Sequence, residues 1–285
     1  MSIVLDELQA LLKLNKIDKG TYQGQSQDLG FRALFGGQVM GQALSAAQET
    51  VSDKRIIHSL HSYFLRAGDA SKPVIYEVEE IRNGSSFSTR RVEALQNDRT
   101  IFYMTASFQQ PEDGLNHQDS MPKVPPPEDL SSFREFMFEN QEFLPKSVRK
   151  KFLAETPIEI RPIQKYNWFQ PKKMPAVCQS WMKTNGTLSD DLRHHHCMLA
   201  YASDFQFLPT SLKPHGASFF LPNFQIATVD HAMWFHRPFR FDDWLLYCID
   251  SPSASNGRGL VRGQIFNTQG ELVASTMQEG VIRQR

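Results

Sequence analysis

The pattern of hydrophobic and polar residues alternates between helical and strand-like stretches. Near the start, apolar residues recur at helical spacing in "MSIVLDELQALLKL", which predicts an amphipathic helix there. The segments "VIYEVEEIR", "FSTRRVEAL" and "IFYMTASF" are short and β-rich, with turns such as "QNDRT" between them. This pattern predicts neighbouring strands. "WLLYCID", "GLVRGQIF" and "ELVASTMQ", with the turn "NTQGE", repeat the plan near the end of the chain.

The two series of strands align with each other, which indicates an internal duplication. The stretch "HSYFLR" (61–66) parallels "HAMWFHR" (231–237). Downstream of it, three pairs of identical residues are 171 positions apart: Tyr76 and Tyr247, Arg91 and Arg262, Thr105 and Thr276.

An unusual helix is predicted ahead of the first series of strands. "FGGQVMGQALSAAQET" (35–50) is rich in Gly and Ala, which gives little side-chain bulk and weakens its helix propensity. Such a helix makes sense if a curved sheet wraps closely around it, which is the hotdog architecture. The fold class expected is therefore α+β: a tandem, or double, hotdog in which each half is an antiparallel sheet around a central helix.

A linker separates the two halves. Residues 109–130, "QQPEDGLNHQDSMPKVPPPEDL", are rich in Pro, Asp and Gln and show no apolar period. A helix is expected within 131–153, where an apolar side is offered by Phe133, Phe136, Met137 and Leu144. The predicted organisation is an N-terminal hotdog domain over 1–110, a linker with a helix over 111–155, and a C-terminal hotdog domain over 156–285.

Composition narrows the possible partners. The chain has 285 residues with 31 basic and 31 acidic side chains, and this zero net charge argues against nucleic acid or an anionic membrane as partner. No run approaches the roughly 18 apolar residues of a membrane span, and the acidic start is unlike a signal peptide. Three scattered cysteines (Cys178, Cys197, Cys248) fit reduced thiols, so a cytoplasmic location is expected.

A search for catalytic motifs leaves few candidates. There is no GxSxG elbow, no Walker A loop, no GxGxxG and no HExxH. The histidines of "RHHHC" (193–197) would point about 100° apart on a helix, so a partly exposed helix surface is favoured over a metal site. His58 and His61 are three positions apart on a predicted strand and therefore on opposite faces, so one of them is expected to point inward. His58 is either a catalytic base or a hydrogen-bonded core histidine.

Four arginines are weaker candidates. A nucleotide-bearing substrate could place its phosphates against Arg90, Arg91, Arg258 and Arg262. Solvated surface arginines are the more common case.

Asp204 is the most unusual candidate because it lies in the apolar stretch "LAYASDFQFLP" (199–209). Its helix is expected to begin near "TLSDDL", capped by Ser189 or Asp190, and to stop before Pro209. Burial and the negative end of the helix dipole both raise the pKa of such a carboxyl. Asp204 is therefore a candidate general base, and the pattern alone favours equally an aspartate that caps a neighbouring loop.

An ordered set of motifs resembles the type II acyl-CoA thioesterases, the TesB-like family. These are "DLGFRALFGGQVMGQAL", "HSYFLRAGD", "IFYMTASFQQPE", "YASDFQFLP", "IATVDHAMWFHRPF" and "STMQEG", and the resemblance covers essentially the whole chain. It implies a double hotdog that hydrolyses acyl-CoA thioesters to free fatty acid and CoA without metal or other cofactor. The family's catalytic Asp, Thr and Gln carry over onto Asp204, Thr228 and Gln278 in this sequence.

Two other functions remain open at this stage. One is another hotdog activity on acyl-CoA, a hydratase or dehydratase, and the other is an acyl-CoA-binding module without catalysis. Because hotdog sheets have exposed edges, a homodimer or homotetramer is also expected.

Overall fold

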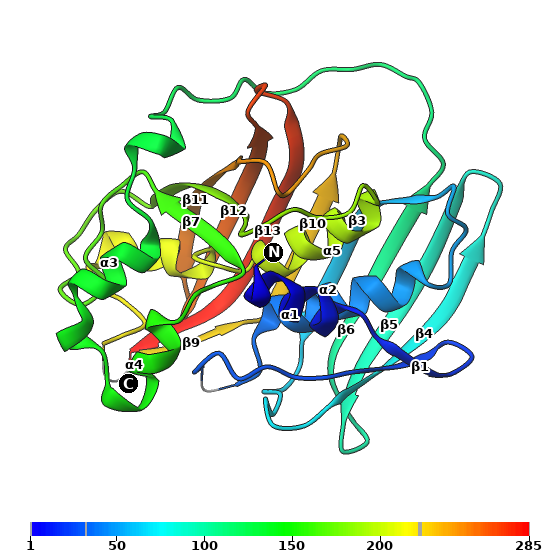
Figure 1. Cartoon of the computed structure of the whole chain (residues 1–285), viewed down its shortest axis with the longest axis horizontal. Coiled ribbons are helices and arrows are strands. Elements are labelled where there is room, and N and C mark those ends of the chain that lie inside the picture. Colours follow the sequence, from blue (N-terminus) through cyan, green and yellow to red (C-terminus); the bar gives the residue numbers. More distant parts are fainter. Residues whose placement is uncertain (1, 32, 222–223, 285) are drawn as a thin grey trace.

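The computed structural model describes residues 2–31, 33–221 and 224–284, and in these residues a single antiparallel sheet connects the whole molecule (Figure 1). The sheet has 13 strands, 12 of them in the order β1-β2-β4-β5-β6-β3-β10-β13-β12-β11-β8-β7, while β9 pairs with β13. The two halves meet where β3 pairs with β10, from Tyr63 opposite Asp230 to Ser59 opposite Trp234. Long-range strand pairing therefore joins the halves into one sheet.

The first half holds two helices and six strands. They are α1 (Ile3–Leu12), β1 (Asn15–Asp18), β2 (Thr21–Gly24), α2 (Gly36–Gln48), β3 (Ile56–Phe64), β4 (Val74–Asn83), β5 (Phe87–Gln96) and β6 (Arg99–Gln109). The amphipathic pattern at the start of the chain does form α1, whose Leu5, Leu8 and Leu12 are buried.

The second half repeats this plan with an insertion. Its elements are β7 (Ile158–Pro162), β8 (Val177–Thr184), α5 (Leu192–Ala202), the 3-10 helix η3 (Leu208–His215), β9 (Phe224–Thr228), β10 (Asp230–Phe235), β11 (Leu245–Ser255), β12 (Arg258–Asn267) and β13 (Leu272–Gln284). Strands β4 and β11 start 171 residues apart, as do β5 and β12, so the offset seen in the sequence is structural. The expected α+β double hotdog is confirmed.

The two central helices, α2 and α5, pack against each other, which adds a second reason for the small residues of α2. A Cβ on Gly37 would overlap the carbonyl oxygen of Tyr201, and one on Gly41 would lie 3.1 Å from the carbonyl oxygen of Cys197. Both carbonyls belong to α5. The small residues of α2 thus let α5 pack closely against it. The same helix also lies beneath the sheet.

The segment between the halves contains two short helices rather than the one expected. They are α3 (Phe133–Glu139) and α4 (Lys146–Leu153), separated by the 3-10 turn η2 (Gln141–Phe143) and by Pro145. A capping box between Ser132 and Glu135 begins α3. Before them, a long irregular stretch containing the 3-10 turn η1 (Pro127–Asp129) passes along the upper edge of Figure 1 to reach the second half.

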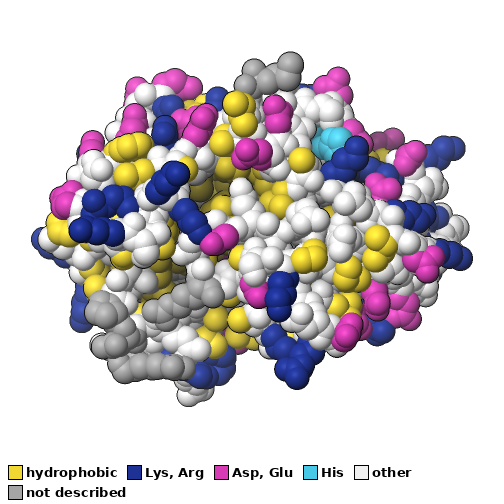
Figure 2. Space-filling view, turned by 60° about the horizontal axis from the view of Figure 1, so that its bottom comes forward, with side chains coloured by type: hydrophobic (Ala, Val, Ile, Leu, Met, Phe, Trp, Pro, Cys, Tyr) yellow, Lys and Arg dark blue, Asp and Glu magenta, His cyan; other side chains and the backbone are white. Residues whose placement is uncertain are grey.

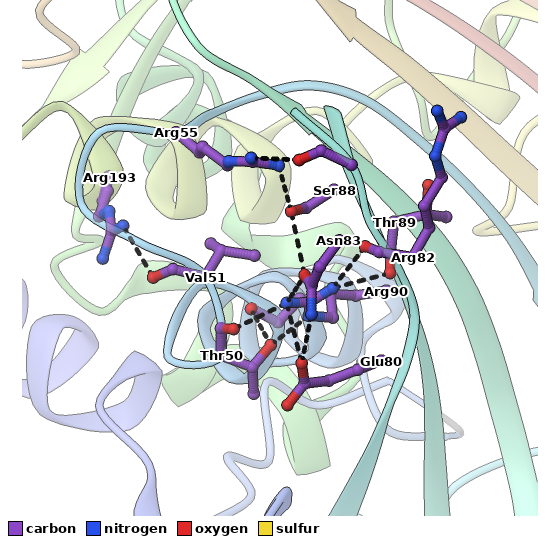
Figure 3. A network of polar contacts seen from close by, with 12 residues as sticks. Thr50, Val51, Arg55, Glu80, Arg82, Asn83, Ser88, Thr89, Arg90 and Arg193 are labelled. Atoms are coloured by element: carbon purple, nitrogen blue, oxygen red, sulfur yellow. Dashed lines mark hydrogen bonds and ion pairs between the residues drawn. The ribbon is translucent and has the colours of Figure 1, made fainter. Parts of the chain in front are cut away.

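A buried arginine lies between the end of α2 and the turn that joins β4 and β5 (Figure 3). Arg90 on β5 is only 1% exposed, and its guanidinium donates to Thr50, to the Arg82 carbonyl and to the Asn83 side chain at 2.7–3.0 Å. It therefore ties the end of α2 to the β4–β5 hairpin. Arg90 is neither a phosphate contact nor a solvated arginine, contrary to both expectations.

Replacing Arg90 by Ala is expected to lower the free energy of unfolding by roughly 3–5 kcal/mol, because the buried guanidinium and its hydrogen bonds to several partly buried acceptors are lost together. Its neighbour Arg91 is the matched control: its ion pair with Glu79, 2.7 Å long, joins two side chains that are about half exposed. Arg91→Ala should cost less than about 1 kcal/mol. Urea unfolding of both variants checks this, and equal midpoints would contradict it.

No helix in the described part of the chain is long and apolar enough to cross a membrane. The three cysteines are free; Cys178 and Cys197 are buried and Cys248 is partly buried.

Candidate active site

Asp204 lies just beyond the carboxyl end of α5, in the turn that leads to η3. The helix begins at Leu192 and its N-cap is Asp191, whose side chain accepts from the Arg193 amide at 3.0 Å, so the expected cap at Ser189 or Asp190 was wrong. The helix ends at Ala202. Asp204 is therefore outside the helix, and its side chain is partly buried rather than enclosed on all sides.

The amino end of α2, from the other half of the molecule, reaches the Asp204 carboxylate. The Gly37 amide donates to Oδ2 at 3.1 Å, and a Cβ on Gly36 would come within 2.8 Å of the same oxygen. Free amides at a helix start favour a negative charge. Asp204 thus lies at the unfavourable end of α5 but at the favourable end of α2.

The pKa of Asp204 is raised to about 6, mainly because burial penalises the charged form. Hydrogen bonding from Gln278, from the Gly37 amide and from Thr228 opposes this rise, in that order of size. The carboxyl is therefore ionised at neutral pH and remains basic enough to accept a proton.

Thr228 and Gln278 come from neighbouring strands at an irregular point of the sheet. Thr228 ends β9 opposite Gly280 of β13, whereas Ala232 of β10 lies opposite Met277. The β9–β10 segment thus has one residue more than β13 over this interval, which is a bulge, a feature that often re-aims side chains beside functional sites. Gln278, fully buried, donates through Nε2 to the Thr228 hydroxyl at 2.9 Å.

The structure therefore brings the three candidates from the sequence together. It also adds two contacts that sequence reasoning missed: the Gly37 amide and a buried histidine, His231, whose Nδ1 lies 2.7 Å from Gln278 Oε1. The sequence held a signal for His231, since it begins the repeated stretch "HAMWFHR". Its counterpart in the first half, His61, is exposed, and only the fold distinguishes the two.

Figure 2 brings the lower side of Figure 1 forward and shows a surface hollow there, with hydrophobic side chains gathered in and around it and charged ones around it. The loops ahead of α2 and after β3 also form a recess of about 420 Å³, lined by Asp28, Phe31, Ala33 and residues 67–71. Phe31 of this recess contacts Phe35, which in turn stacks on Phe205, the neighbour of Asp204.

Comparison with known proteins places this chain in a family. Residues 147–281 match the model of acyl-CoA thioesterases, and residues 25–109 match the model of the acyl-CoA thioesterase N-terminal domain. The chain is 48% identical to acyl-CoA thioesterase 2 of Haemophilus influenzae over 99% of both chains.

The chain belongs to the acyl-CoA thioesterase family. Its enzyme class is accordingly that of the thioester hydrolases. It is also 41% identical to human acyl-coenzyme A thioesterase 8, covering 96% of this chain and 88% of the human one. The crystal structure of an acyl-CoA thioesterase II from Mycobacterium marinum superimposes with a TM-score of 0.80 at 40% identity, over 98% of each chain.

The other histidines singled out in the sequence lie apart from this candidate site. His58 is half-buried and lies 2.8 Å from Ser107, which alternates with the buried Ala106 and Phe108, so it is on the outer face of the sheet. His61 on the same strand is exposed. The expectation that one of the two points inward was wrong.

The "RHHHC" stretch was also misjudged as a partly exposed helix surface. His195 and His196 are each 1% exposed, and only His194 is exposed. His195 contacts the Ser189 carbonyl and the Phe241 amide, while His196 packs on aromatic rings. In the described residues, no group of three His, Cys, Asp or Glu side chains is arranged to hold a metal.

The remaining arginines are paired with carboxylates. Arg262 contacts Asp250 at 2.8 Å and Arg258 contacts Glu279 at 2.9 Å, all with substantial exposure. These pairs favour the solvated interpretation over phosphate binding.

Proposed function

We propose that the chain hydrolyses acyl-CoA thioesters to free fatty acid and CoA by means of a water activated by Asp204 and oriented by Thr228 and Gln278. The observation that carries the proposal is the convergence of Gly37, Thr228 and Gln278 on one carboxylate with a raised pKa. Family membership supports the reaction, and the geometry supports the assignment of roles.

The chemistry needs few groups. Asp204 accepts a proton from water as the water oxygen attacks the thioester carbonyl, a step that general bases accelerate by about 10²–10⁴-fold. The tetrahedral intermediate then collapses, the carbon–sulfur bond breaks, and CoA leaves as a thiolate that takes up a proton. A thiolate is a good leaving group, so no metal, other cofactor or acyl-enzyme is required.

The negative charge on the carbonyl oxygen requires donors fixed in advance. We propose that the amino end of α2 supplies one of them at Gly36, because the Gly37 amide already donates to Asp204 and the Gln38 amide to the Phe35 carbonyl. The small Gly36 lets the backbone come close to Asp204.

The test is release of thiol from acyl-CoAs of several chain lengths by the purified protein. Release of one CoA per fatty acid formed is expected. Loss of an enoyl-CoA double bond without thiol release would instead indicate a hydratase, and saturable binding without turnover would indicate a binding module. The Asp, Thr and Gln set favours hydrolysis, because hydratase chemistry requires a His or an acidic pair at the β-carbon.

The dependence of kcat/KM on pH provides a check on the base. Asp204 must be ionised to act, so kcat/KM should fall as pH drops through a midpoint near 6. The residual activity of Asp204→Asn should lack this limb. A wild-type profile that is flat from about pH 5 to about pH 8 would contradict the role of Asp204 as base.

A homodimer or homotetramer and a cytoplasmic location stay predictions. Tyr63 and Met277, from strands on the two sides of β10, are both exposed, and an oligomer would bury such side chains.

A further inference from the structure

His231 on β10 is a fully buried histidine that contacts Gln278 of the candidate site. It is 1% exposed, its Nδ1 lies 2.7 Å from Gln278 Oε1, and its Nε2 lies 3.2 Å from the Ser203 hydroxyl. Its ring packs on Phe207, and its carbonyl accepts from Ser62 on β3. The imidazole therefore has one position and two polar partners.

The partners dictate which nitrogen carries the proton. Burial lowers the pKa of His231 to about 4, so at neutral pH the ring is uncharged and has one N–H. The Gln278 amide oxygen faces Nδ1, and an amide oxygen can only accept, so Nδ1 must hold the proton. Nε2 is then an acceptor and takes the Ser203 hydroxyl proton.

Ser203 has an alternative acceptor, the Ala200 carbonyl at 2.9 Å, but its single hydroxyl proton can serve only one of the two. If the proton went to Ala200, Nε2 of His231 would have to donate and Nδ1 would accept. Gln278 would then have to turn its NH₂ toward His231. The direction of the Ser203 hydroxyl, the tautomer of His231 and the orientation of Gln278 are thus linked.

The orientation of the Gln278 amide matters for Asp204. With Oε1 on His231, the NH₂ group faces the Thr228 hydroxyl and the carboxylate side of the site. In the reversed orientation, a carbonyl oxygen would face the carboxylate, so a stabilising donor would be replaced by a repulsive dipole.

We propose that His231 is a positioning residue: its Nδ1–H holds the Gln278 amide with the NH₂ toward Thr228 and Asp204, and Ser203 sets the required tautomer. Ser203 donates to His231, His231 donates to Gln278, and Gln278 donates to Thr228, so the hydrogen bonds run toward Asp204. This role rests on the proposed mechanism, in which Asp204 and Gln278 hold the attacking water.

Three substitutions at His231 separate positioning from packing. Asn carries its side-chain nitrogen close to the place of Nδ1, whereas Gln carries it close to the place of Nε2. His231→Gln and His231→Ala should lower kcat by about 10- to 100-fold with little change in KM, and His231→Asn should restore most of the loss. Equal kcat in the Asn and Gln variants, or full kcat in the Ala variant, would overturn the role.

His195→Gln is the matched control, since His195 is equally buried but bonded to backbone groups of Ser189 and Phe241. It should lose stability and keep kcat, and a fall of kcat as large as in His231→Gln would overturn the positioning role. Nitrogen-15 NMR of the wild-type protein needs no variant to fold and should place the His231 proton on Nδ1. A proton on Nε2 instead would overturn the role.

Asp204→Asn, measured beside these variants, distinguishes the two levels of the proposal. An inactive Asp204→Asn with a fully active His231→Ala rejects only the positioning role. A fully active Asp204→Asn rejects the proposed mechanism itself, whatever the His231 variants do.

Discussion

Asp204→Asn is expected to lower kcat by about 10²–10⁴-fold while leaving KM for acyl-CoA nearly unchanged. The amide cannot accept the proton of the attacking water, yet it has nearly the shape of the carboxyl and keeps an oxygen for the Gly37 amide. Binding of the acyl and CoA groups does not depend on that proton. Thiol release under saturating substrate measures the effect.

Asp242→Asn is the matched control for this substitution. Its carboxylate is also hydrogen-bonded, accepting from the Leu188 amide and from Arg240 at 2.9–3.0 Å, but it serves to fix a loop ahead of α5. Asp242→Asn should lower the melting temperature and leave kcat close to that of the wild type. If Asp204→Asn kept most of its kcat while folding normally, Asp204 would be a structural cap.

Gly37→Ala is expected to reduce both stability and turnover. In most helices this change gains up to about 1 kcal/mol, since Ala is the better helix former. Here the new Cβ would overlap the Tyr201 carbonyl and come within 2.6 Å of the Phe35 ring. The helices must then separate, which we expect to cost about 1–3 kcal/mol or more and to pull the Gly37 amide away from Asp204.

The sign of the stability change is therefore diagnostic. Gly114→Ala, in the linker, is the control because nothing lies within 4 Å of its added Cβ; it should be silent in thermal unfolding and in kcat. A Gly37→Ala variant as stable and active as the wild type would show that α2 and α5 are further apart than the structure places them.

Local pattern predicted much of this fold. The alternation in "VIYEVEEIR" and its repeat near the chain end became β4 and β11, with the same offset of 171 residues. Strand period and turn residues are properties of a few neighbouring positions, so they can be read from one sequence. The double hotdog followed because the same pattern occurs twice, and resemblance to a family added Asp204, Thr228 and Gln278.

Other expectations failed where the deciding contact is distant in the chain. Arg90 looked like a surface arginine, but Thr50, 40 residues earlier, accepts its protons within the core. His195 and His196 looked like an exposed surface and are buried, because the sheet of the second half covers that side of α5. Composition carries no information about which side of a helix a sheet will cover.

Sequence by itself determined the main helices and strands of the repeated pattern and the duplication, and its resemblance to a family supplied the three residue types on which the proposed chemistry depends. Only the tertiary structure decided what surrounds Asp204: the Gly37 amide from 167 positions away and the Gln278 side chain oriented by His231 from 47 positions away. These contacts favour the ionised form of Asp204 and decide which way the surrounding donors point. They arise from packing two helices and closing one sheet, which depends on all strands together and on no single stretch of sequence.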